Sequence, residues 1–304
     1  MEIKFNNPFT TGGNWYKGNL HTHTTQSDGP FSPAETVKQY KEAGYHFLSL
    51  TDHYRVTRVK DNRGLLLIAG EEIDCGIPQL ARGFGYHIVA LNIREEITIP
   101  KKGTKKTRPQ EMISRIKSLG GEAVIAHPAF SNLTVNELLS LKDYFAIEVF
   151  NTCSFWVLDK GYAMDVWDKI LIAGRNICGI AADDTHNPGN NYQPADIGGA
   201  WIMVKSENLT GQDIMNSIKK GLFYASRGPQ IKDVKITDGV IRVKTSPVES
   251  ISFIGLPTGG RRFNSLGKEP LEEISFRIDK EKCIRIQCAD AHGRMAWTNA
   301  IFIK

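Results

Sequence analysis

The sequence lacks any long apolar run. No stretch approaches the roughly 20 residues that a membrane-spanning helix requires, and the first eight residues, Met1 to Pro8, lack the apolar core of a signal peptide. We therefore expect a cytoplasmic protein without a membrane partner. The chain is also poor in cysteine. Its five cysteines are odd in number and form no CxxC pair, which argues against a disulfide framework and against zinc-finger modules.

An excess of one charge is also missing. The formal net charge of +5 is small for 304 residues, so the composition does not indicate a nucleic-acid-binding protein. One local exception is the run from Lys101 to Arg108, in which five of eight residues are cationic. Such runs usually form solvated loops, and we interpret this one in that way. A loop that guides anions is the alternative.

The chain is long enough for one large domain and a smaller one. Helix and strand signals alternate over residues 1–230. Ser32 supplies an N-cap, Pro33 a proline at N1 and Glu35 a capping-box glutamate, and Gly44 marks the end of that helix. The apolar strands are near-continuous, as in parallel sheets covered on both faces, and we expect the array to close into a barrel. Functional groups of such barrels lie on loops at the carboxyl ends of the strands.

The pattern changes after Arg227-Gly228-Pro229. Residues 231–304 consist of short alternating strands separated by Gly, Pro and Asp turns, with little helical periodicity. We predict a small β-sandwich-like domain that acts as a structural cap or an oligomer contact. A carbohydrate- or protein-binding module is the alternative, although this region shows no obvious exposed aromatic cluster for a glycan.

The histidines are few and their positions are informative. Six of the eight belong to a series of metal-ligating residue types, most of which directly follow apolar strands. In a strand, residues i and i+2 point to the same side, so His21 and His23 can reach one ion, as can Asp184 and His186. Each residue alone would be unremarkable, but their order predicts a polynuclear metal site. The series comprises His21, His23, Asp28, His53, Glu72, His87, His127, Asp184 and His186.

The ligand types indicate the class of metal. Imidazole with carboxylate favours Zn, Mn or Fe over Ca or Mg. Glu72 suits a bridging role, since its two oxygens can each hold a different cation. Asp52 precedes a ligand and would point to the other side of its strand, so we expect a structural hydrogen bond there. We also expect structural roles for His46 and His292 and packing roles for Trp156 and Trp167.

Six motifs resemble the PHP family, named for polymerase and histidinol phosphatase, over roughly residues 15 to 230. They are Asn19-Leu20-His21-Thr22-His23, Ser27-Asp28-Gly29, Leu50-Thr51-Asp52-His53, Gly70-Glu71-Glu72, Ala126-His127-Pro128 and Asp184-Thr185-His186. Three further segments look more like its CehA/McbA branch. They are Trp15-Tyr16-Lys17-Gly18, Arg227-Gly228-Pro229 and Ala296-Trp297-Thr298-Asn299-Ala300.

The resemblance implies a distorted (β/α)7 TIM-like barrel with two or three divalent Zn, Mn or Fe ions. The implied ligands are His21, His23, Glu72 and Asp184 for the first ion, Glu72, His87 and His127 for the second, and Asp28, His53 and His186 for the third. Some phosphatase members carry histidine where this chain has Asp28. The metal preference and occupancy of the third site therefore stay open.

The resemblance also implies phosphoester hydrolysis. A small phosphorylated metabolite or nucleotide would be attacked by a metal-bound hydroxide, with Asp184, His186 and Glu72 as catalytic residues. Candidate substrate contacts are Arg227, which can hold phosphate bidentately, Asn151 and Asp183. One alternative is hydrolysis of a carbamate, aryl ester or amide. Another is a non-catalytic module like those attached to DNA polymerases, against which the complete ligand set argues.

Overall fold

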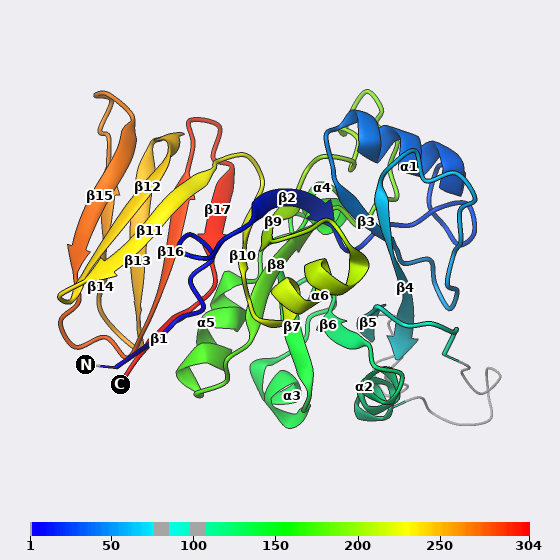
Figure 1. The fold of residues 1–304 in the computed structure, drawn as a ribbon, viewed down its shortest axis with the longest axis horizontal. Helices are drawn as coiled ribbons and strands as arrows, with labels where there is room; N and C mark the ends of the chain where they lie inside the picture. The colour runs from blue at the N-terminus through cyan, green and yellow to red at the C-terminus, as the bar shows by residue number, and fades with distance from the viewer. Residues whose placement is uncertain (1, 76–84, 98–107) are drawn as a thin grey trace.

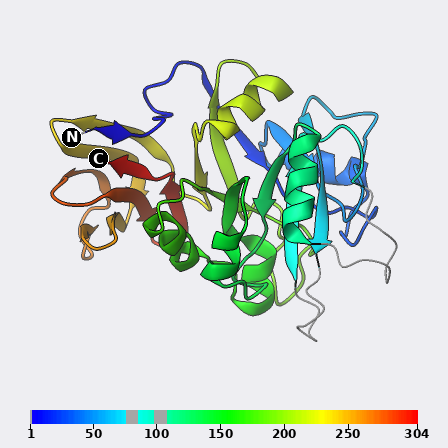
Figure 2. The same ribbon diagram turned by 90° about the horizontal axis from the view of Figure 1, so that it is seen from below.

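The computed structural model describes residues 2–75, 85–97 and 108–304 (Figure 1). Within these ranges, one 15-stranded sheet runs through the molecule and a 3-stranded sheet lies beside its end. The views in Figures 1 and 2 place the helices around one part of the molecule and the strands that follow residue 230 at the other end. The basic run that begins at Lys101 lies outside the described residues except for Arg108.

Seven neighbouring strands form the part of the large sheet that the helices surround. In spatial order they are β2 (Asn14–Asn19), β3 (Phe47–Leu50), β4 (Leu66–Cys75), β5 (Tyr86–Leu91), β6 (Glu122–Ile125), β7 (Tyr144–Asn151) and β8 (Cys178–Ala182). Pairing is parallel along β2, β3 and β4 and along β6, β7 and β8, but β5 is antiparallel to both neighbours. The expected strands are therefore present in a mixed rather than an all-parallel sheet.

The predicted barrel is not seen as a closed sheet. Among the described residues, no hydrogen-bonded ladder joins β8 to a second neighbour. The reason lies in the pairing of β2, whose second edge is occupied by β9 (Trp201–Ser206), and β9 in turn pairs with β10 (Phe223–Ser226). Local contacts nevertheless connect the ends of β2 and β8. They include an isolated bridge between Thr22 and Thr185 and hydrogen bonds from Asp184 N to His21 O at 2.9 Å and from Asp183 N to Asn19 Oδ1 at 3.1 Å.

Six helices lie within the described residues, and α1 begins where its capping signals predict. They are α1 (Pro33–Glu42), α2 (Pro109–Ser118), α3 (Val135–Ser140), α4 (Thr152–Leu158), α5 (Met164–Ile172) and α6 (Gly211–Lys219). Ser32 accepts a hydrogen bond from the Glu35 amide, and Thr134 and Glu137 complete a reciprocal capping box. No helix in the described ranges combines the length and apolar character that crossing a membrane requires. The cytoplasmic location stays a prediction.

The chain after residue 230 forms strands throughout. They are β11 (Ile231–Thr237), β12 (Val240–Val248), β13 (Ser250–Leu256), β14 (Gly260–Asn264), β15 (Leu271–Arg277), β16 (Cys283–Ala289), β17 (Met295–Thr298) and β18 (Ile301–Ile303), which pairs with β1 (Ile3–Lys4). The sheet β11-β12-β15 packs on β13 and β16 through a common apolar core that includes Val243, Phe253 and Ile286. The expected boundary after residue 230 falls between β10 and β11. Because β17 pairs with β10, the large sheet continues across it.

A buried ion pair fixes these strands against the helical part. Arg285 on β16 binds Asp168 of α5 through two of its nitrogens, one at 2.7 Å, and its side chain is only 4% exposed. The guanidinium also lies over the ring of Trp167, which is fully buried and donates to the Ile177 carbonyl oxygen at 2.7 Å. The predicted packing role of Trp167 is confirmed.

Candidate metal centre

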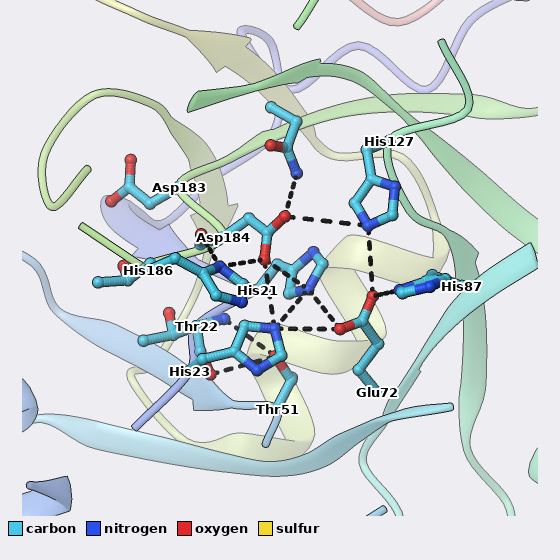
Figure 3. Close-up of polar contacts among 12 residues, drawn as sticks. His21, Thr22, His23, Thr51, Glu72, His87, His127, Asp183, Asp184 and His186 are labelled. Atoms are coloured by element: carbon cyan, nitrogen blue, oxygen red, sulfur yellow. Dashed lines mark hydrogen bonds and ion pairs between the residues drawn. The ribbon is translucent and has the colours of Figure 1, made fainter. Parts of the chain in front are cut away.

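The nine candidate ligands gather at one end of the strands of the large sheet. His21 and His23 follow β2, His53 follows β3, His127 follows β6, and Asp184 and His186 follow β8. His87 lies near the start of β5, which is at the same edge because β5 is antiparallel to its neighbours. Figure 3 shows several of these side chains converging on Glu72 and Asp184 from different strands. The structure therefore brings together the residues that the motifs predict.

Four donor atoms form a compact inner group. His21 Nε2 and His23 Nε2 are 3.1 Å apart, and each lies 3.2 Å from Asp184 Oδ1. Glu72 Oε2 lies 3.3 Å from His21 Nε2 and 3.0 Å from His23 Nε2. A tetrahedral ion with bonds of 2.0–2.1 Å would hold its ligands about 3.3–3.4 Å apart. The inner group therefore fits one small divalent cation.

The electrostatics of the inner group also suit a cation. Burial favours the neutral carboxyl of Glu72, but His21 and His87 outweigh it and hold its pKa well below the usual range. Burial acts in the same direction on Asp184, whose pKa is held low by His21 and His186. Asp184 Oδ1 is buried and accepts no hydrogen bond. A buried carboxylate oxygen of this kind is stabilised when it coordinates a metal.

Glu72 connects the inner group to a second set of histidines. Its Oε1 atom lies 2.9 Å from His87 Nδ1 and 3.4 Å from His127 Nε2, while Oε2 faces the inner group. His53 Nδ1 lies 3.4 Å from Oε2, and the ring centroids of His53 and His87 are 5.6 Å apart, so His53, Glu72 and His87 form a further potential donor group. The two oxygens of Glu72 thus face different nitrogens, which is the geometry that a bridging carboxylate needs.

A third group lies around Asp28. Its carboxylate oxygens are 3.4 Å from His186 Nε2, 3.6 Å from His53 Nε2 and 3.4 Å from His23 Nδ1. The side chain of Asp28 is 51% exposed and that of His186 30%, whereas His21 and His23 are fully buried. The third group therefore forms the open side of the cluster, where a ligand from solvent would arrive.

Polar residues behind the ligands hold them in place. Asp52 accepts hydrogen bonds from Thr24 N at 2.7 Å and Ser27 Oγ at 2.9 Å, and Ser27 Oγ lies 3.1 Å from His23 Nδ1. This agrees with the structural role expected for Asp52. Gly29 permits the close approach of this loop, because a Cβ there would lie 2.3 Å from the backbone of His23.

Two of the three expected substrate contacts have supporting positions instead. Asp183 is fully buried, and its carboxylate accepts hydrogen bonds from Tyr40, Thr152 and the amides of residues 198 and 200. Burial raises its pKa to about 7, and Figure 3 shows it directed away from the cluster. Asn151 is also fully buried, and its amide is engaged on both sides. The polar atoms of both side chains are thus buried and hydrogen-bonded in this structure, and substrate contact by either residue stays a prediction.

Arg227, the third expected contact, lies in an aromatic environment. Its guanidinium carbon is 4.0 Å from the ring centroid of Phe150 and 4.5 Å from that of Phe155, and it donates to the Tyr162 hydroxyl. Burial lowers its pKa. No described contact connects Arg227 with the nine ligands, and its role in phosphate binding stays a prediction.

Glu148, Cys153 and Asp196 were missed by the sequence reasoning. Glu148 contacts His21 from β7, Cys153 forms a potential donor group with Asp184 and His186, and Asp196 accepts hydrogen bonds from the amides of residues 186 and 187. Only Glu148 had a usable signal, a lone acidic residue within an apolar strand. His46 accepts a hydrogen bond from Lys17 N at 3.0 Å, and His292 lies exposed between β16 and β17, as expected.

Comparison with known proteins gives partial matches. No protein-family model matches the chain. A 5′-3′ exoribonuclease of Haemophilus influenzae is 31% identical over 118 residues, which are 34% of this chain and 41% of that protein. An uncharacterized protein of Methanocaldococcus jannaschii is 30% identical over 108 residues, 36% of this chain and 44% of that protein. The chain thus matches about two fifths of the length of these relatives.

A solved structure matches much more of the chain. It is a two-domain protein from Bacteroides vulgatus, described as containing a predicted PHP-like metal-dependent phosphoesterase. The match has a TM-score of 0.52 and 15% sequence identity, and it covers 91% of this chain and 90% of the other. The chain therefore shares a mixed α/β fold with a two-domain PHP-like protein over almost its whole length.

Proposed function

We propose that the protein is a metal-dependent phosphoesterase that acts on a small phosphorylated metabolite or a nucleotide. The observation that carries the proposal is the buried group of four donor atoms from His21, His23, Glu72 and Asp184, with a solvent-facing group beside it. Sharing of Glu72 between donor groups supports more than one ion. We propose two or three divalent ions, drawn from Zn, Mn and Fe, because the donors are imidazoles and carboxylates.

Each part of the cluster has a proposed task. Bound ions would neutralise phosphate oxygens and lower the pKa of a water molecule. The inner group would hold its ion out of contact with bulk solvent, and Glu72 would fix the spacing to the second set of histidines. Asp28, His53 and His186 would meet the substrate at the open side. We propose catalytic roles for Glu72, Asp184 and His186 on these grounds.

One observation favours a second candidate function. In the three described ranges, no lysine or arginine forms an ion pair with the cluster. A phosphate would therefore be neutralised by the ions and histidines alone. A carbamate, aryl ester or amide carries less charge and would need no additional cation, so the same centre is suited to hydrolysing these substrates.

The arrangement of the two halves is part of the proposal. Residues 1–230 would form the metallohydrolase unit, and residues 231–304 would form a β-domain that braces it through Arg285 and the pairing of β10 with β17. The resemblance to the CehA/McbA branch is consistent with this plan and stays a prediction.

Phosphate release tests the proposed function. Protein reconstituted with Mn²⁺ would be assayed for inorganic phosphate release from a panel of phosphomonoesters and nucleotides. Short 5′-phosphorylated RNA would be assayed for release of nucleoside monophosphates, since a matched relative is named an exoribonuclease. Asp184→Asn is the control for contaminating phosphatase, because it removes an inner-group charge without changing side-chain size. We expect release by the wild type that disappears in the variant. A wild type that holds its metals but releases neither phosphate nor nucleoside monophosphates would direct the search to carbamates, aryl esters and amides.

A further inference from the structure

Strand β7 carries two buried polar residues that belong to neither the ligand set nor the apolar core. Glu148 and Asn151 are both fully buried, with Ile147, Val149 and Phe150 between and beside them. A buried carboxylate without partners would cost several kcal/mol. The partners of these two side chains are therefore the key to their role.

Glu148 contacts two of the nine candidate ligands directly. Its Oε1 atom lies 2.7 Å from His21 Nδ1, on the side of the ring opposite to the inner group. Its Oε2 atom accepts a hydrogen bond of 2.8 Å from the backbone amide of His127. His127 has a positive φ of 26°, a backbone conformation that such an acceptor helps to hold. One carboxylate thus acts on ligands that follow two different strands.

Asn151 connects this carboxylate with Asp184. Its Nδ2 group donates to Glu148 Oε2 at 2.8 Å and to Asp184 Oδ2 at 3.0 Å. Its Oδ1 atom accepts a hydrogen bond of 2.8 Å from Ser154 N, which makes Asn151 the N-cap residue of α4. The two donations and the one acceptance fix the orientation of the amide. Asp184 is thereby held with Oδ2 toward Asn151 and Oδ1 toward the inner group.

We propose that Glu148 and Asn151 are positioning residues that preorganise the metal centre. Glu148 accepts a hydrogen bond from the Nδ1–H group of His21, which leaves the Nε2 lone pair directed at the inner group. Asn151 orients Asp184, and Glu148 also holds the His127 backbone. The inference rests on the metal binding in the proposed function, but it does not depend on which bond the enzyme hydrolyses.

The test is the metal affinity of Glu148→Gln. The glutamine has the same shape, but it cannot accept all three hydrogen bonds, because its amide group must face the Nδ1 proton of His21 or the donors of His127 and Asn151. We expect Zn²⁺ to bind about 10- to 100-fold more weakly, as for other groups that support metal ligands. Competition against a chromophoric chelator measures this change, and far-UV circular dichroism checks the fold.

A buried glutamate on the neighbouring strand provides the matched control. Glu122 on β6 is 3% exposed and pairs with Lys117 and Lys219, each at 2.8 Å, without contacting any ligand. Glu122→Gln removes a buried charge too, and we expect it to change stability but not Zn²⁺ affinity. Equal loss of affinity in both variants would show a general structural effect and would overturn the inference.

The remaining outcomes separate the two proposals. Wild-type protein that binds no metal would overturn the proposed function itself. Wild-type protein that binds Zn²⁺ with the same affinity as Glu148→Gln would overturn the inference alone. If Glu148→Gln does not fold, Glu148→Asp decides the question in the same way, since it keeps the charge but cannot reach both His21 and His127. In the NMR spectrum of the zinc-loaded wild type, we expect a visible resonance for the His21 Nδ1 proton, which Glu148 protects by a hydrogen bond. In Glu148→Gln we expect a weaker resonance.

Discussion

Glu72→Gln is expected to remove bound metal from more than one position and to lower hydrolysis by at least about 10³-fold. Glu72 is 1% exposed and faces the inner group with one oxygen and His87 and His127 with the other. A metal ion contributes several kcal/mol of transition-state stabilisation, and 1.36 kcal/mol corresponds to a tenfold change in rate. Metal content by elemental analysis and phosphate release would be measured on the same preparation.

The adjacent residue Glu71 supplies the control for this prediction. Glu71 is also fully buried, but it lies on the opposite face of β4, where it accepts a hydrogen bond of 2.7 Å from Ile97 N. Burial raises its pKa to about 7, so a neutral glutamine is a mild change there. Glu71→Gln should keep both metal and activity. If it loses as much as Glu72→Gln does, the bridging role of Glu72 is refuted.

Asp168→Ala is expected to lower the free energy of unfolding by about 3 kcal/mol. The substitution leaves Arg285 charged and without its bidentate partner while its side chain is only 4% exposed. Breaking a buried ion pair in this way typically costs about 3–5 kcal/mol, and the 19% exposure of Asp168 favours the lower end. Urea unfolding at constant metal concentration measures the change.

A double substitution separates the unpaired charge from other effects. Asp168→Leu combined with Arg285→Met removes both charges, and such replacements are often close to neutral. The double variant should therefore regain most of the lost stability. Metal content should be unchanged in both variants, because neither residue contacts the cluster. A single variant that loses less than about 1 kcal/mol would mean that solvent already screens this pair.

The clustering of the candidate ligands was predictable because short spacings encode it. His21 with His23 and Asp184 with His186 are pairs two residues apart at strand ends, and strand ends meet at one edge of a sheet. The cap at Ser32 was likewise readable, since capping depends on residues within one helical turn. Features of this kind depend on neighbouring residues alone and can therefore be predicted without knowledge of the fold.

The features that the sequence did not reveal depend on contacts between distant segments. The sequence of the antiparallel strand β5 is as apolar as those of its neighbours, so its direction could not be predicted from composition. The pairing of β9 with β2 occupies the strand edge that a closed barrel would need. It joins segments that are far apart in the sequence, Asn14–Asn19 and Trp201–Ser206. Glu148 has no motif, and its role follows only from the position of His21.

Within the described residues one edge of β8 has no ladder partner, and this has a consequence for stability. The gap between β8 and β2 is bridged by Thr22 with Thr185, by His21 with Asp184 and by Asn19 with Asp183. His21 and Asp184 also belong to the inner donor group. An ion bound there would link the end of β2 to the end of β8, and its binding energy would stabilise the fold only while these two strand ends stay together. Loss of the ion should therefore favour local opening between β2 and β8 before the rest of the sheet unfolds.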